Sequence, residues 1–207
     1  MSAAPPDAPF TAEVWTFDRT DLLGSRPTKL EGQPKIISGP SGKAMLFDGV
    51  DDALFVDGHP LAGAQTFTWE AIFRPDGGDH EQRWFHLQGK NSQGEDADSR
   101  MLFEIRVTPA GRYLDSFVHS GNVQKALINP ELLHPPGVWY HVAAVYDGSE
   151  LRSYVNGVQE GAAKLSLSPQ VNGHSSIGVR IPTSKARFSQ PASPSARLLP
   201  KSSLKVR

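Results

Sequence analysis

The chain has 207 residues, a formal net charge of -1 and no cysteine. The lack of cysteine excludes disulfides, thiol catalysis and zinc–thiolate sites, and the small charge argues against nucleic acid or an anionic membrane as a partner. No apolar run approaches the roughly 18 residues of a membrane span, so we expect no membrane insertion. The length suits one all-β domain, and 19 glycines and 17 prolines are typical of many short strands joined by turns.

Residues 1–12 are rich in Ala and Pro and are predicted to form a flexible arm. They show neither the basic nor the apolar region of a secretory signal, so we expect a cytoplasmic protein. Short strands with turn residues between them, and no convincing helix, predict a sandwich or jelly roll over residues 13–181. The predicted strands lie near 14–17, 35–37, 43–48, 53–57, 67–74, 83–88, 101–107, 112–118, 123–127, 139–146, 151–156 and 174–180.

The clearest local pattern is the predicted hairpin over residues 139–157, which reads WYHVAAVYDGSELRSYVNG. Two strands are separated by Asp147-Gly148, and Asn156-Gly157 marks the next turn. Asp-Gly and Asn-Gly supply the positive φ angles that two-residue hairpin turns require.

Three further segments have distinctive patterns of their own: AMLFDGVDDALFV at 44–56, FTWEAIFRP at 67–75 and SSIGVR at 175–180. Together the four segments resemble the laminin-G-like jelly roll of the concanavalin A-like lectin/glucanase superfamily, over residues 13–181. The resemblance implies a β-sandwich of two antiparallel sheets. That fold hosts lectins, glycosidases and adhesion modules, so the fold alone does not determine the function.

The chain changes character near its end. No acidic residue follows Glu160, and the alternation of strands stops after Ile181, so residues 182–207 are predicted to be irregular or disordered. The family that the chain resembles places one more strand here, beside the N-terminal strand. We therefore hypothesise a reading-frame slip, which would leave a sheet edge unpaired; the alternative is an ordinary basic, disordered extension. Sequencing the gene distinguishes them.

Alternation along neighbouring strands predicts one apolar and one polar sheet face. Carboxylates and arginines on the polar face can hydrogen-bond sugar hydroxyls, and aromatic rings can stack on a sugar. Asp115 or Ser116 is a further candidate on this face. The alternative is an ordinary solvated face with cross-strand salt bridges. The predicted ligand-binding residues are Glu70, Arg74, Trp84, His86, Glu104, Arg106, His141 and Tyr154.

A glycoside hydrolase would need two carboxylates on opposite sides of the scissile bond. Glu70 and Glu104 are the candidate catalytic pair if their strands are neighbours. The chain lacks the E-x-D-x-x-E pattern of laminarinase-like members of the superfamily. Nearby arginines would also hold both carboxylates ionised, whereas a general acid needs a raised pKa. These two points disfavour catalysis.

Ca²⁺ is the cofactor that the acidic residues could bind, because hard oxygen ligands suit it. Asp48, Asp51 and Asp52 are the candidate ligands. Asp is equally common in turns, where its side chain binds the backbone without any metal. No EF-hand spacing is present, so we expect no cofactor, with Ca²⁺ as the alternative.

The sequence therefore predicts a non-catalytic module that binds carbohydrate through the polar face of one sheet. A structural or protein-interaction module is the alternative, with loops instead of the sheet face as the contact surface. A hydrolase that uses Glu70 and Glu104 is the third hypothesis.

Overall fold

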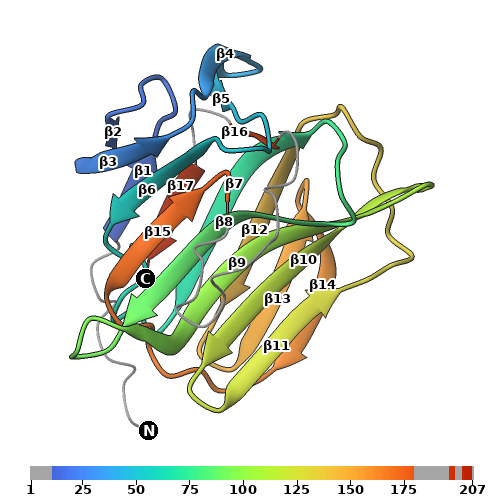
Figure 1. The fold of residues 1–207 in the computed structure, drawn as a ribbon. Coiled ribbons are helices and arrows are strands. Elements are labelled where there is room, and N and C mark those ends of the chain that lie inside the picture. Colours follow the sequence, from blue (N-terminus) through green and yellow to red (C-terminus); the bar gives the residue numbers. More distant parts are fainter. Residues whose placement is uncertain (1–10, 180–195, 199–201, 207) are drawn as a thin grey trace, which may run out of the picture.

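The computed structural model describes residues 11–179, 196–198 and 202–206, whose strands form two antiparallel sheets that lie face to face (Figure 1). We refer to these as the β7 sheet and the β9 sheet, after one central strand of each. None of the described residues is helical, so none forms a helix that could cross a membrane. The arrangement confirms the predicted all-β jelly-roll sandwich.

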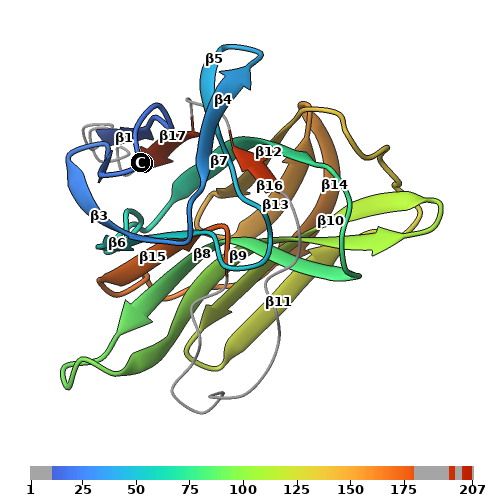
Figure 2. The same cartoon turned by 45° about the horizontal axis from the view of Figure 1, so that its top comes forward.

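The β7 sheet runs in the order β14-β13-β12-β7 and then divides. One part of β7 pairs with β17, which pairs with β1, and the other part pairs with β16, which continues to β5 and β4. The β4–β5 hairpin projects from the sandwich (Figure 2). The strands are β1 (Thr11–Trp15), β4 (Lys35–Gly39), β5 (Gly42–Leu46), β7 (Phe67–Pro75), β12 (Tyr140–Tyr146), β13 (Glu150–Val155), β14 (Val158–Lys164), β16 (Ala196–Leu198) and β17 (Ser202–Val206).

The β9 sheet runs in the order β11-β10-β9-β8-β15-β6-β3-β2. Its longest strands, β8, β9 and β10, are neighbours, so they present a broad continuous surface on each side. The strands are β2 (Leu22–Leu23), β3 (Arg26–Glu31), β6 (Ala53–Asp57), β8 (Glu81–Lys90), β9 (Asp96–Thr108), β10 (Gly111–Ser120), β11 (Val123–Ile128) and β15 (Gly173–Ile177).

The predicted hairpin over 139–157 is confirmed as β12 and β13, which pair in register. At the following turn Asn156 and Gly157 have φ angles of 50° and 81°, as their sequence predicts. At the first turn only Gly148 has a positive φ, and Asp147 instead accepts hydrogen bonds from the backbone N–H groups of Ser149 and Glu150. The side chain of Asp147 therefore stabilises this turn as an Asx-type turn.

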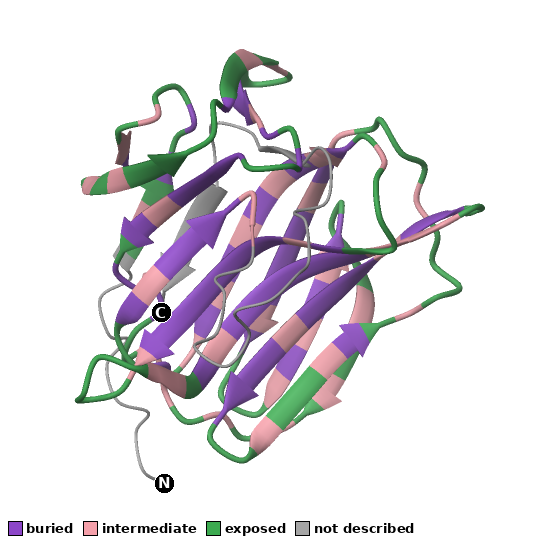
Figure 3. Cartoon of the chain, in the orientation of Figure 1, coloured by how far each residue is buried: buried purple, intermediate pink, exposed green. Residues whose placement is uncertain are grey.

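Among the strands that the sequence did not predict are β3 and β14. Both are largely exposed, and their sequences, RPTKLE and VQEGAAK, show no apolar alternation. A strand at or near a sheet edge buries little, so its sequence has little need of the alternation that identifies a strand. Figure 3 shows the same contrast between the mostly buried central strands and the exposed β14 and β11.

The C-terminal segment differs in part from its prediction. Residues 196–198 and 202–206 form β16 and β17, so β7 and β1 are paired where the frame-slip hypothesis expected an open edge. Backbone N–H and C=O groups can pair in a sheet whatever the side chains are. The amino-acid composition of the segment therefore did not predict this pairing. The rest of the predicted tail, like residues 1–10 of the predicted arm, lies outside the described residues. The frame slip itself stays a hypothesis.

Four aromatic rings stack on one another between the sheets, as part of a larger buried apolar core. Trp69 of β7 stacks on Phe103 of β9, with ring centroids 4.0 Å apart. Phe73 of β7 stacks on Trp84 of β8 at 4.3 Å, and Trp84 also stacks on Phe103 at 5.6 Å. All four rings are buried. Since successive side chains of a strand point to opposite faces, this stack determines which residues point outward.

Gly178 follows β15 and has a φ of +88°; a Cβ atom there would lie 2.8 Å from the backbone oxygen of Asp52 and 2.4 Å from the Phe47 ring. Gly157, at +81°, has no atom within 4 Å of the same position. We expect Gly157→Ala to cost about 1 kcal/mol of backbone strain. Gly178→Ala should cost about 3 kcal/mol, because a steric clash adds to that strain. Urea denaturation of both variants would measure this, and equal costs would contradict the packing described around Gly178.

Candidate functional site

The structure places the predicted site residues on two opposite outer faces and in the core. Four of them lie on the outer face of the β7 sheet, where strand alternation points them away from the aromatic stack. Three lie on the outer face of the β9 sheet. The eighth, Trp84, lies between the sheets. The first group is Glu70, Arg74, His141 and Tyr154, and the second is His86, Glu104 and Arg106.

The candidate catalytic pair is wrong. Glu70 follows Trp69, and Glu104 follows Phe103, and these two rings stack on each other between the sheets. Both carboxylates therefore point away from the core, on opposite sides of the molecule. The hypothesis required neighbouring strands, but β7 and β9 belong to different sheets. Glu70 and Glu104 cannot act on one glycosidic bond.

Trp84 is not an aromatic platform for a ligand, because it is 1% exposed and packed between Phe73 and Phe103. The prediction assumed strict alternation along β8. The register shifts between Arg83 and Phe85, as in a β-bulge, and the rings at positions 84 and 85 both point inward. His86 returns to the outer face but is fully buried there.

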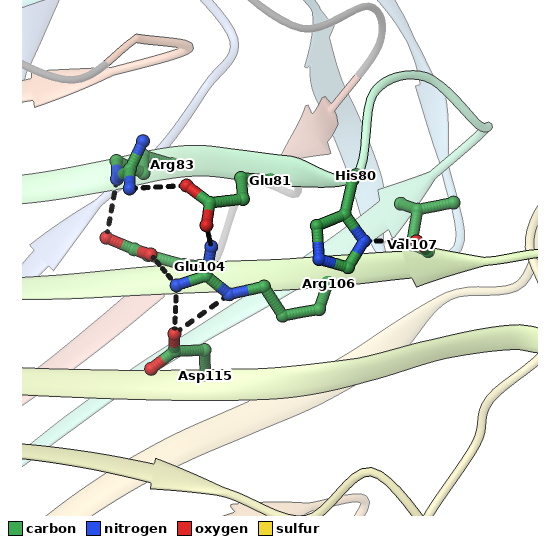
Figure 4. Close-up of polar contacts among 7 residues, drawn as sticks. All are labelled: His80, Glu81, Arg83, Glu104, Arg106, Val107 and Asp115. Atoms are coloured by element: carbon green, nitrogen blue, oxygen red, sulfur yellow. Dashed lines mark hydrogen bonds and ion pairs between the residues drawn. The ribbon is translucent and has the colours of Figure 1, made fainter.

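The outer face of the β9 sheet carries a cluster of five charged side chains, which we call the ionic cluster (Figure 4). The register of the sheet creates it: Arg83, Glu104 and Asp115 lie side by side on β8, β9 and β10, and Glu81 lies opposite Arg106. The ionic cluster therefore joins three neighbouring strands. Its members are Glu81, Arg83, Glu104, Arg106 and Asp115.

The two arginines of the ionic cluster bind all three carboxylates. Arg83 donates from Nε to Glu104 at 3.0 Å and from Nη2 to Glu81 at 2.6 Å. Arg106 donates from Nη2 to Glu104 at 3.0 Å and to Asp115 at 2.6 Å, and its Nη1 contacts Glu81. Each guanidinium is thus held by two or more charged partners, which fixes its orientation.

The ionic cluster has a buried layer and an exposed layer. The Glu104 and Asp115 side chains are 6% and 2% exposed, whereas those of Arg83 and Glu81 are 23% and 40% exposed. The Asp115 Oδ1 atom is buried and has no hydrogen-bond partner in the described part of the chain. The buried acids anchor the arginines from below, so the exposed layer can present fixed donors and acceptors to a ligand.

Burial raises the pKa of Glu104 above its usual value, and the opposing charges of Arg83 and Arg106 do not cancel this effect. Burial likewise raises the pKa of Asp115, against the hydrogen bond from Arg106. The expectation that nearby arginines would keep the pKa of Glu104 from being raised was therefore wrong, because it left out burial. For the exposed Glu81, burial also acts to raise the pKa, but Arg106 and Arg83 outweigh it and hold the value below normal.

Sequence reasoning missed two of the five members. Both lie at the start of β8: Glu81 precedes the predicted strand, and Arg83 is its first residue. The signal that could have found them is the spacing of Glu81 and Arg83, because side chains two positions apart in a strand point to the same face. Asp115 was a predicted addition to the polar face, and Glu104 and Arg106 were predicted members.

The outer face of the β7 sheet holds separate pairs and no joint cluster of the four residues predicted there. His141 Nε2 lies 2.9 Å from Glu70 Oε2. Arg74 binds Asp76 at 2.6 Å. The Tyr154 hydroxyl donates to Gln159 on the neighbouring β14 at 3.2 Å. Arg74 also lies over the ring of Trp139, 5.3 Å from its centroid.

Asp48, Asp51 and Asp52 form a compact acidic group whose ligand atoms lie within 4.8 Å of one another, so the group could hold a metal ion. Backbone hydrogen bonds also account for much of its geometry. Asp52 accepts from the N–H groups of Gln33 and Asp48 at 2.6 and 2.9 Å. Asp48 accepts from Val50 N–H at 2.8 Å, and this bond holds the pKa of Asp48 below its usual value.

The raised pKa of Glu104 predicts a pH dependence of stability. Just above the normal carboxyl range, folded Glu104 keeps a proton that the unfolded chain has released, so its contribution to stability falls as pH rises. From pH 7 to pH 4.5, wild type should therefore gain unfolding free energy relative to Glu104→Gln. Urea denaturation at both pH values measures the difference.

Glu81→Gln is the matched control for this prediction, because the pKa of Glu81 is lowered. Its stabilising contribution is lost as pH falls, so wild type should lose stability relative to Glu81→Gln over the same range. A Glu104→Gln difference that stays constant with pH, or follows that of Glu81→Gln, would contradict the assignment.

Residues 48–189 match the family model described as the concanavalin A-like lectin/glucanases superfamily, while a search of curated proteins finds no match. Similar solved structures include domain 4 of AbnA, a GH43 extracellular arabinanase from Geobacillus stearothermophilus, in complex with arabinotriose. Its TM-score is 0.62 with 15% identity, and the alignment covers 95% of each chain. Bacillus licheniformis β-glucanase has a TM-score of 0.58 and 10% identity, over 96% of this chain and 98% of that chain.

The binding domain of botulinum neurotoxin DC, in complex with SialylT, is also similar, with a TM-score of 0.61 and 7% identity. The alignment covers 94% of this chain and 46% of that chain. At these identities the likeness to solved structures shows the fold alone.

Proposed function

Because the chain belongs to the concanavalin A-like lectin/glucanase superfamily, we propose that it is a non-catalytic carbohydrate-binding module whose ligand site is the ionic cluster. The observation that carries the proposal is the layered arrangement of the cluster on the outer face of the β9 sheet. Glu104 and Asp115 lie below, and Arg83 and Glu81 lie at the surface.

Sugar hydroxyls donate and accept hydrogen bonds at closely spaced positions, so their recognition needs donors and acceptors in fixed geometry. In the ionic cluster, Arg83 uses Nε and Nη2 for the carboxylates, which leaves Nη1 outside those contacts. A guanidinium that is already oriented loses little freedom when a ligand binds. The partly exposed Glu81 carboxylate supplies an acceptor beside it.

The charge balance of the ionic cluster favours neutral glycans. Three carboxylates face two guanidinium groups, and ion pairs join these five side chains. An additional carboxylate or sulfate on a ligand would meet this excess of negative charge. The two similar structures that hold arabinotriose and SialylT support a carbohydrate ligand in general, because they share the fold.

A protein-interaction module is the second candidate, and one observation favours it. Leu132, Leu133 and Val138 lie in the connection between β11 and β12 and are 37%, 39% and 46% exposed. Apolar side chains that gather on one exposed loop can form the centre of a protein contact. A protein ligand would bind this loop, whereas a glycan would bind the ionic cluster.

The test is thermal unfolding of the wild type against a panel of neutral and acidic oligosaccharides. A ligand that binds only the folded state raises Tm, and we expect at least one neutral glycan to do so. In Arg83→Met the glycan should bind about 30-fold more weakly, because charged hydrogen bonds worth about 2 kcal/mol are lost.

Arg74→Met is the matched control, since Arg74 also pairs with an acid two residues away but lies on the outer face of the β7 sheet. It should keep the full glycan response. If Arg74→Met loses the response while Arg83→Met keeps it, the glycan binds the β7 sheet and the assignment to the ionic cluster is wrong. If no glycan raises the wild-type Tm, the carbohydrate proposal fails and the loop around Leu133 becomes the place to seek a partner.

A further inference from the structure

Arg112 is an arginine buried inside the sandwich. It occupies an inward position of β10, two residues before the core residue Leu114, and is 3% exposed. Its guanidinium carbon lies 4.7 Å from the ring centroid of Tyr140 on β12. Its Nη1 atom is 3.5 Å from the backbone oxygen of Pro75, at the end of β7. Strands from both sheets therefore surround this side chain.

The buried charge of Arg112 has no carboxylate partner among the described residues. Asp76 attracts it through space, but the Asp76 carboxylate is bound to Arg74 at 2.6 Å. Glu160 contacts His134 at 2.9 Å, and His134 reaches Arg112 only through backbone hydrogen bonds. A buried cation without a counter-charge is costly. Burial lowers the pKa of Arg112 to about 10, so the group still carries its charge at neutral pH.

Arg112 lines a small pocket, and its Nη2 atom is buried without a hydrogen-bond partner in the described part of the chain. The pocket has a volume of about 10 Å³, which is room for one particle of about the size of water. Its walls include apolar side chains from both sheets, such as Phe73 and Ile105. Tyr113 and His134 line it as well and are only half-buried, so they connect it to the surface.

We propose that this pocket binds one small monovalent anion of halide size, which supplies the negative charge that Arg112 lacks. A single water molecule would fit and could bind polar side chains of the lining such as Arg112 and His134, but it carries no negative charge. A halide needs mainly a cation and tolerates apolar walls. Polyatomic anions such as sulfate are too large for the volume. The site lies between the sheets and is independent of glycan binding.

The test is the chloride dependence of Tm at constant ionic strength, with gluconate as the replacing anion. Binding to the folded state gives a rise in Tm that follows the logarithm of 1 + [chloride]/Kd. We expect this rise in wild type and its loss in Arg112→Met. Arg152→Met, which removes an exposed arginine paired with Asp147 and Glu150, should keep it. Equal Tm values for wild type in chloride and gluconate would overturn the proposal.

A second measurement needs no variant and so does not depend on the folding of Arg112→Met. Crystals of the wild type grown in bromide should show an anomalous scattering peak beside Arg112 Nη2. An ordered pocket that contains only a water molecule, without an anomalous peak, would overturn the proposal.

Discussion

The stacking of aromatic rings between the two sheets is the interaction on which the rest of this molecule depends. Trp69 and Phe73 of β7 meet Phe103 of β9 and Trp84 of β8. These rings bury large apolar areas in specific geometry. Because side chains alternate along each strand, the position of the stack also decides what faces solvent. It separates Glu70 from Glu104 and leaves the ionic cluster on one side of the molecule only.

The ionic cluster shows how burial and pairing compete at one place. Its arginines stabilise the charged form of the carboxylates, whereas burial destabilises that form. Burial prevails at Glu104 and Asp115, whose pKa values are raised, and the arginines prevail at Glu81, whose pKa is lowered. A purely structural salt-bridge network would gain little from such burial. Arg112 is also buried, but Asp76 acts on its charge only through space, and burial still lowers its pKa.

The sequence predicted what depends on local periodicity. Strand β7 alternates between buried and half-buried residues over its whole length, as its letters indicate, and the hairpin of β12 and β13 follows its turn residues. It could not predict what depends on pairing between distant strands, so Glu70 and Glu104 were placed together wrongly. Nor could it predict the irregular register of β8, a local departure from alternation that placed Trp84 in the core. Leu114 and Val118 lie in the core, and alternation along the same strand indicates that Arg112 points inward too. A charged side chain at an apolar position does not by itself indicate burial, so this position was not predicted.

The division of the β7 sheet has a consequence for the order of events in folding. β1 lies at the N-terminal end of the described chain, and its strand partner is β17, with Thr11 opposite Val206. During synthesis, β1 must wait until residues 202–206 have been made before it can pair. Pairings so distant in sequence are slow to form, and strands that wait unpaired can associate with other chains. The hairpins of β8 to β11 and of β12 to β14 need no such delay, so these parts of the two sheets can form from local contacts while β1 is still unpaired.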